Sequence, residues 1–596
     1  MRIFYLLTVA VMFLLTGCGG SQPGVEPVKP VQITGEHPTV AWILACRVEG
    51  EGFGCFPGDS AFVTRTGMAC EALAEMGEPG NLPDKESIVS WLKSKQQPDG
   101  GFIEAHDYYQ NKLLPWGSLS ALEPTYWALK TLRLLGSEPD RPKAAARFIR
   151  ARQLPSGAFD SYELGWNTTR TREMAYSTFW AVAALKELGE PVPDSAQVVE
   201  WARSLQDTQS GLGGFRLGDN AFIIYTVQGT YYAVRILELL GARPRRPALV
   251  KKFLLSSYGQ EADGGFECGH GDNWNNYDHY SRMVDTYGSV YALELLGMPL
   301  SDHDTSRASQ PASDCADWIA SVQNPDGGFA RFGVTEQTPL RTPSEMRATW
   351  QAVKTLKLLG RELPCPDNLV VPANEVRPHV PGYRYPAIHN DDPAEVWAYR
   401  RIALPIYSHY LKESGSRIKA LGWLSRWARA AVSPMNAAFC TGGRSLLMHG
   451  CGQCAQMSLM LQKLAASVDY PARFSFTKGC VGGDVNCEIL VQEEGWGQPH
   501  WCLFIPFSNE YPDPAVPTPE GKINGWSGLD CIIDFKNRRN ILNFPSRTRL
   551  GDHCFLTVRI ETIDYNKASW AGEYRMDTLT TYNSEVAKIL YPGASW

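Results

Sequence analysis

The stretch Gln97-Pro98-Asp99-Gly100-Gly101-Phe102 recurs along the first part of the chain and decides its fold. Asp-Gly-Gly allows a tight reversal through positive φ, and the following phenylalanine can anchor the turn in a core. A degenerate copy lies at residues 50–56. The clear copies end in phenylalanines 51 to 63 residues apart, namely Phe102, Phe159, Phe215, Phe266 and Phe329. A nearly fixed period of this length indicates a repeat architecture.

A second helix is expected after each turn. It begins with threonine and aromatic residues, as in Thr125-Tyr126-Trp127, and it ends with Leu-Gly, as in Leu135-Gly136. Its apolar residues recur at helical spacing, and the final glycine suits a left-handed C-cap. Because two helices per repeat cannot bury their faces alone, about six units must stack, either in an open solenoid or in a closed ring.

This turn, followed by a helix rich in Tyr and Trp, resembles the repeat of protein prenyltransferase β-subunits and squalene cyclases, from about Thr39 to Leu363. The resemblance implies an all-α (α/α)6 toroid, in which an outer ring of helices surrounds an inner ring. Five agreeing copies make it specific for fold, whereas a fold alone does not give a function.

The zinc site implied by the prenyltransferase resemblance is not matched. Asp285 stands at the aspartate position, but Tyr287 stands at the cysteine position and Arg347 near the histidine position. Tyrosine and arginine cannot replace a thiolate and an imidazole on Zn²⁺. The acidic Asp-x-Asp-Asp motif of the cyclases is also absent. We therefore predict a toroid without metal or cofactor that serves for binding or as a scaffold.

One local cluster could bind a metal by composition alone, but a solvated insertion after the turn is the favoured interpretation. It consists of His270, Asp272, Asp278 and His279.

The first residues predict export and lipidation. Arg2 precedes an apolar run too short to span a bilayer, which is typical of a signal peptide. Leu15-Thr16-Gly17-Cys18 resembles the lipobox of bacterial lipoproteins, in which the cysteine is acylated; a plain secretory signal is the alternative. This resemblance implies a protein anchored to the membrane of the bacterial cell envelope through lipidated Cys18, facing the periplasm or the outer surface.

Length and composition divide the chain further. A chain of 596 residues exceeds what one core can fill, so at least two large domains are expected. We predict a signal peptide at 1–18, a flexible tether at 19–38, the toroid at 39–363, a proline-dense linker at 364–393 and a second domain at 394–596. A net charge of −6 offers no basic footprint for nucleic acid.

The second domain has a cysteine at the start of a predicted helix. Cys454 is followed by Met457, Leu461 and Leu464 on one helical face. The start of a helix favours the thiolate, and Gln453 offers an amide donor near a developing oxyanion. A structural pair of Cys451 and Cys454, either redox-active or disulfide-bonded, is the alternative interpretation.

This segment and the turn Tyr470-Pro471-Ala472-Arg473 resemble the transglutaminase-like superfamily, an α+β fold of the papain-like cysteine type. The resemblance implies that Cys454 is the nucleophile, His500 the base on a following strand and Asp530 the residue that orients it. Asp534 is the fallback for Asp530.

The sequence departs from the family pattern around the base. The family histidine usually begins His-x-Trp-x-Glu, and no glutamate follows His500 at that spacing. A second register puts Asn486 or its neighbours at the histidine position and leaves no base.

Three classes of function follow. In the first, the triad cleaves or transfers an acyl group at an amide, and the toroid presents a peptide, protein or glycan substrate at the cell surface. In the second, the protein is a surface binding protein without catalysis, with a degenerate transglutaminase-like domain. In the third, the toroid is an isoprenoid or terpenoid enzyme with a site that the sequence does not reveal. The sequence gives no oligomeric state.

Overall fold

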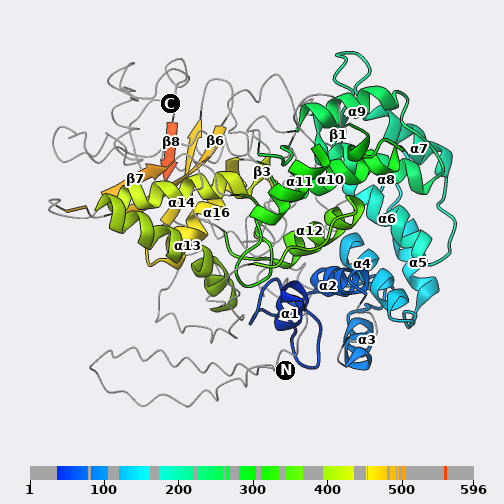
Figure 1. The fold of residues 1–596 in the computed structure, drawn as a ribbon, viewed down its shortest axis with the longest axis horizontal. Helices are drawn as coiled ribbons and strands as arrows, with labels where there is room; N and C mark the ends of the chain where they lie inside the picture. The colour runs from blue at the N-terminus through cyan, green and yellow to red at the C-terminus, as the bar shows by residue number, and fades with distance from the viewer. Residues whose placement is uncertain are drawn as a thin grey trace, which may run out of the picture.

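The computed structural model of this chain describes residues 37–77, 82, 84–104, 120–160, 173–218, 225–258, 263–268, 281–303, 311–333, 342–366, 393–434, 447, 451–452, 454–470, 472–478, 483–491, 493–494, 500–504, 506 and 556–559. Figure 1 shows paired helices in blue to green, and helices packed beside a sheet in yellow to orange. No helix among the described residues is both long and apolar enough to cross a membrane.

An inner ring of helices forms the centre of the N-terminal part. Each helix packs against the next, and the last packs against the first, so the ring is closed. Each is preceded by a residue in extended conformation, and five of the six are followed by Leu-Gly. Their bounds are α2 (Val63–Glu75), α4 (Leu122–Leu134), α6 (Ala175–Glu187), α8 (Val227–Leu239), α10 (Met283–Leu295) and α12 (Met346–Leu358).

The outer ring consists of shorter helices, each leading into one repeat turn. They are α1 (Pro38–Ala45), α3 (Lys85–Ser94), α5 (Pro142–Arg150), α7 (Ser195–Ser204), α9 (Pro247–Ser256) and α11 (Pro311–Ser321). Between them lie the short strands β1 (Phe215–Arg216) and β2 (Tyr225–Thr226), and the 3₁₀ turn η1 (Leu300–His303). The predicted α/α toroid is thus confirmed.

The turn phenylalanines anchor the repeats as expected. All are fully buried, and each donates its backbone N–H to the hydroxyl of the threonine in the following inner helix, at 2.9–3.0 Å. In the degenerate first copy, Phe53 takes this position and pairs with Thr66. The Leu-Gly ends also behave as predicted; Gly136, for example, adopts φ +68° after α4.

In four of the six repeats, a glutamine among the described residues links the turn to the next outer helix. Gln96 bonds the backbone of Arg141 before α5, and Gln206 does the same with Arg246 before α9. The structural equivalent in the first clear copy is therefore Gln96 and not Gln97, because the contact requires the glutamine four residues before Gly100. Gln323 of the last turn bonds Thr39 of α1, so the ring closes on its own N-terminal helix.

The C-terminal part combines helices with a sheet, and the expected transglutaminase-like fold of this part stays a prediction. The helices are α13 (Pro393–Ser414), α14 (Arg417–Ala431) and α16 (Cys454–Ser467), which pack against one another. The four-stranded antiparallel sheet has the order β7-β6-β5-β8, with β5 (Ala472–Lys478), β6 (Gly483–Val491), β7 (His500–Phe504) and β8 (Leu556–Arg559).

Two further segments approach α16. The short strands β3 (Ser433–Pro434) and β4 (Cys451–Gly452) pair in parallel just before the helix begins. α16 itself packs on β5 and β6.

Most of the predicted linker, residues 367–392, and the predicted signal peptide and tether up to residue 36 lie outside the described residues.

Candidate functional site in the toroid

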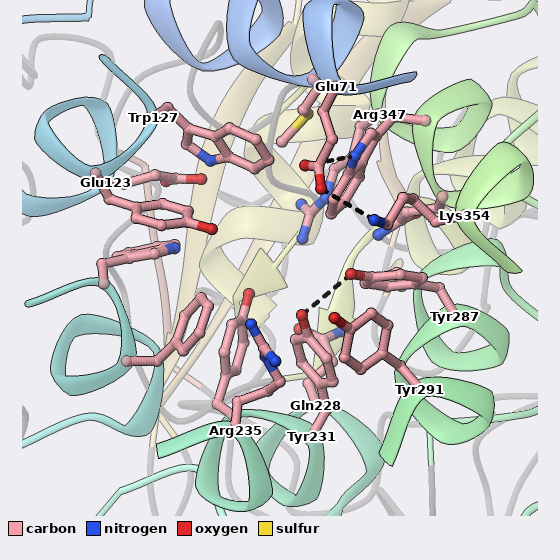
Figure 2. A pocket seen from close by; sticks show the side chains of 18 of the residues that line it. Glu71, Glu123, Trp127, Gln228, Tyr231, Arg235, Tyr287, Tyr291, Arg347 and Lys354 are labelled. Carbon is pink, nitrogen blue, oxygen red and sulfur yellow. Dashed lines mark hydrogen bonds and ion pairs between the residues drawn. The ribbon is translucent and has the colours of Figure 1, made fainter. Parts of the chain in front are cut away.

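The six inner helices surround a central pocket lined by aromatic side chains (Figure 2). Its empty space is about 660 Å³, including the part open to solvent. The aromatic lining residues are Tyr126, Trp127, Phe179, Trp180, Tyr231, Tyr232, Tyr287, Tyr291 and Trp350. Such a lining favours a ligand with a large apolar body.

The repeat itself places these rings. In five of the six inner helices, α2 being the exception, a threonine is tied to the turn phenylalanine and the residue after that threonine lines the pocket. Trp127 and Trp350, which come from α4 and α12, pack edge to face with ring centres 5.4 Å apart. The hydroxyls of Tyr231 and Tyr287 lie 3.2 Å apart, and burial raises the pKa of Tyr231 to about 12.

Four cationic side chains also line the pocket, namely Lys130, Arg235, Arg347 and Lys354. Three of them stand one helical turn after a pocket aromatic, as Lys130 does after Tyr126. This spacing of four residues puts ring and cation on the same helix face. It is the sequence signal that could have identified these cations before the structure.

Glu71 of α2 holds two of these cations. Its carboxylate lies 2.9 Å from Nζ of Lys130 and 3.0 Å from Nζ of Lys354, and it accepts a 3.1 Å hydrogen bond from Nε1 of Trp350. Burial opposes ionisation of Glu71, but the two lysines lower its pKa to about 2. Glu71 is therefore ionised at neutral pH.

Glu123, at the start of α4, behaves in the opposite way. Burial, reinforced by the nearby carboxyl of Glu104, raises the pKa of Glu123 to about 8, against the opposing effect of Arg347 and Arg65. Burial thus favours the protonated form of Glu123. The four cations outnumber the two carboxyl groups, Glu71 and Glu123, among the charged lining residues, so the pocket favours an anion.

The positions expected for zinc in a prenyltransferase do not form a metal site. Asp285 is buried in the first turn of α10, where burial raises its pKa to about 6 despite the opposing effects of Arg282 and Gln228. Tyr287 pairs with Tyr231, and Arg347 lines the pocket as a cation. Among the described residues, no group of His, Cys, Asp or Glu could hold a metal ion. The cluster around His270 lies outside the described residues.

The predicted residues of the second domain are described only in part. Cys454 is the first residue of α16 and His500 the first residue of β7, so the predicted helix and strand begin where the sequence pattern indicated. Gln453, Asp530, Asp534 and Cys18 lie outside the described residues.

The strand register bears on the two interpretations of the base. α16 joins β5 through a short turn, and Gln462 in its C-terminal half donates to the carbonyl of Ala472, the first residue of β5. At 1.5 Å per residue, Cys454 lies about 12 Å from Gln462 along the helix, in the direction away from this turn. His500 pairs with Val491 at the turn end of the sheet, whereas Asn486 pairs with Ser475 further along β5. Along the strand axis, Asn486 therefore lies nearer than His500 to the level of Cys454, and the pairing of Cys454 with His500 stays a prediction.

The comparisons with known proteins concern the toroid. The family model "Prenyltransferase alpha-alpha toroid domain" matches residues 26–117, 118–266 and 224–370. Among solved structures, Candida albicans protein geranylgeranyltransferase-I complexed with GGPP is 17% identical, with a TM-score of 0.37, over 50% of this chain and 84% of that chain. Type II terpene cyclase MstE from Scytonema is 13% identical, with a TM-score of 0.35, over 54% of this chain and 95% of that chain. No curated protein matches the chain.

Proposed function

The chain belongs to the prenyltransferase α-α toroid family, and from this premise we propose that its central pocket binds an organic anion with a large apolar body. The observation that carries the proposal is the excess of cationic side chains inside an aromatic wall. Aromatic rings bury the apolar part of a ligand, and cations in a partly desolvated pocket bind its charged group strongly.

Arg235 is the residue best suited to the charged group. Its guanidinium lies 5.5 Å from the ring centre of Phe179 and 4.9 Å from that of Tyr291, which orients it across the pocket wall. Its ion pair with Glu238 uses Nη1, at 3.2 Å. Within the described part of the chain, Nε of Arg235 is buried and has no hydrogen-bond acceptor. An anionic ligand would supply that acceptor.

Binding of a probe pair tests this proposal. Farnesyl diphosphate carries an apolar chain and an anionic head, whereas farnesol carries the chain alone. We expect farnesyl diphosphate to bind more tightly in calorimetric titrations and Arg235→Gln to weaken its binding about 10- to 100-fold, because one charge-assisted hydrogen bond contributes about 1.5–3 kcal/mol. Arg133→Gln, at an exposed arginine that pairs with Glu187 at 3.2 Å, is the matched control. The proposal is contradicted if farnesol binds as tightly as farnesyl diphosphate, or if Arg235→Gln binds farnesyl diphosphate with the wild-type affinity.

A second function is proposed for the C-terminal part, in which Cys454 stands at the nucleophile position of a transglutaminase-like domain. The helix start at Cys454 and the sheet beneath α16 support this proposal. In the catalytic version, Cys454 attacks an amide carbonyl of a peptide, protein or glycan conjugate, His500 carries the proton, Asp530 orients His500 and Gln453 donates to the oxyanion. In the other version, Asn486 replaces the base and the domain only binds. Either version fits a chain anchored to the cell envelope through Cys18, which we also propose.

Alkylation by iodoacetamide separates the two versions. We expect Cys454 to react about tenfold faster at pH 7 than the exposed Cys365, because a helix N-terminus stabilises the thiolate. In the catalytic version, His500→Ala slows this reaction strongly, because the imidazolium no longer stabilises the thiolate; in the binding-only version, it leaves the rate within about twofold. His553→Ala is the control. A strong slowing by His500→Ala alone would establish the pairing of Cys454 with His500, and a Cys454 no faster than Cys365 would contradict the proposed thiol.

A further inference from the structure

In the five repeats where it is described, the residue two positions after the turn phenylalanine makes the same backbone contact. Its carbonyl oxygen accepts a hydrogen bond from the first residue of an inner helix, as when Met346 N–H donates to Cys55 and Met283 N–H to Arg331. The described residues at this position are Cys55, Glu104, Leu217, Cys268 and Arg331. Because any residue can make a backbone contact, the arginine side chain in the last repeat serves another purpose.

The Arg331 side chain reaches out of the toroid into the C-terminal part. Its Nε and Nη2 bond the two carboxylate oxygens of Glu345 at 2.8 and 2.7 Å, which fixes the plane of the guanidinium. Nη1 then donates to the carbonyl of Ala431 at 3.3 Å, and Nη2 donates to the carbonyl of Leu447. The next residue, Phe332, packs on Trp427 of α14 with ring centres 6.0 Å apart.

These two carbonyls precede the strands that lead to Cys454. Ala431 ends α14 and lies two residues before β3, and Leu447 lies four residues before β4. Because β3 pairs with β4 and α16 begins two residues after β4, one guanidinium holds both segments that set the start of α16.

The same ion pair reaches the central pocket. Glu345 is the N-cap residue of α12, and the first turn of that helix carries Arg347, which lines the pocket. Arg331 keeps the pKa of Glu345 below its usual value although burial opposes ionisation. The pocket is thus connected to the segments before Cys454: Arg347 follows Glu345 by two residues, and Glu345 pairs with Arg331, which bonds both segments.

We propose that Arg331 and Glu345 are positioning residues for Cys454, so that the toroid controls the geometry, and hence the thiol reactivity, of the C-terminal part. This inference rests on the thiol proposed above. It is specific to the last repeat, because the equivalent described positions in the other repeats carry cysteine, leucine or glutamate.

The test uses the full chain with the double substitution Arg331→Met/Glu345→Gln. Arg331→Met alone would leave Glu345 buried without its counter-ion, and the variant could then fail to fold. Removing both partners avoids this unpaired charge. We expect amide hydrogen exchange over residues 447–454 to become about tenfold faster, while exchange in α6 stays as in the wild type. We also expect the pH profile of Cys454 alkylation to shift, which a purely structural contact elsewhere would not cause. Arg133→Met, which removes a toroid arginine far from Cys454 in the sequence, is the control.

Two outcomes decide the inference. Unchanged exchange over residues 447–454 together with an unchanged alkylation profile overturns it, provided that the double variant folds with the wild-type circular dichroism spectrum. The inference is supported if Arg331→Lys keeps the wild-type alkylation profile while the double variant does not, because lysine keeps a donor to the two carbonyls. If wild-type Cys454 proves no more reactive than Cys365, the proposed thiol fails by itself, and hydrogen exchange alone decides whether Arg331 positions the segment.

Discussion

Gly327→Ala is expected to destabilise the toroid by about 3 kcal/mol, since the left-handed conformation costs an L-residue about 1–2 kcal/mol and an overpacked core typically about 1–3 kcal/mol. Gly327 has φ +89°, and a Cβ added there would lie 2.4 Å from the carbonyl oxygen of Pro38. Neither backbone can yield without opening the contact between the last turn and α1.

That contact is the closure of the ring. Thr39 donates to the carbonyl of Gly327 at 2.9 Å, Gln323 donates to Thr39 at 3.2 Å, and Trp42 donates to Asp326 at 3.1 Å. These residues are nearly 300 positions apart in the chain, so their loss releases the N-terminal helix from the last repeat. We therefore expect the variant to unfold at lower denaturant concentration and α1 to become accessible to proteases first.

Gly360→Ala supplies the matched control. Gly360 also has positive φ, +64°, but nothing lies within 4 Å of an added Cβ. Its substitution should cost only the conformational strain, about 1–2 kcal/mol. Urea unfolding followed by circular dichroism measures both, and equal losses in the two variants would show that the contact with Pro38 is unimportant.

The repeat could be predicted from sequence because its information is local. Gly-Gly-Phe turns, Leu-Gly ends and helical spacing each specify a conformation within about ten residues, and the structure follows them in every described repeat. The glutamine was assigned one residue late at Gln97, because two glutamines are adjacent there and only the contact with Arg141 distinguishes them.

The pairing of charges in the pocket could not be predicted in the same way. Lys130, Lys354 and Glu71 come from three different helices, so no sequence spacing reports that they meet. The same holds for Arg331, whose partners lie 100 and 116 residues further along the chain. In the C-terminal part, the helix at Cys454 was readable from periodicity, whereas the position of His500 depends on strand register, which single-sequence patterns specify weakly.

Glu71→Gln is expected to lower the stability by about 3 kcal/mol at pH 7, because a pKa of about 2 in place of the ordinary 4.5 corresponds to that free energy. The substitution leaves Lys130 buried without an ionic partner, whereas Lys354 keeps its contact with Glu75. The sign of the pH dependence follows from the lowered pKa. The contribution of Glu71 is present in full above pH 4.5 and is lost as the pH falls from about 4.5 to about 2.

The wild type should therefore lose stability across this acid range more steeply than Glu71→Gln, and the two unfolding curves should converge near pH 2. Glu200→Gln is the control. Like Glu71, Glu200 pairs with two cationic side chains, here arginines at 2.9 and 3.0 Å, but it is exposed on α7. Exposed ion pairs contribute little to stability, so this variant should resemble the wild type. If Glu71→Gln unfolds at the wild-type urea concentration at pH 7, the two lysines do not depend on Glu71, and the charge balance proposed for the pocket must be redrawn.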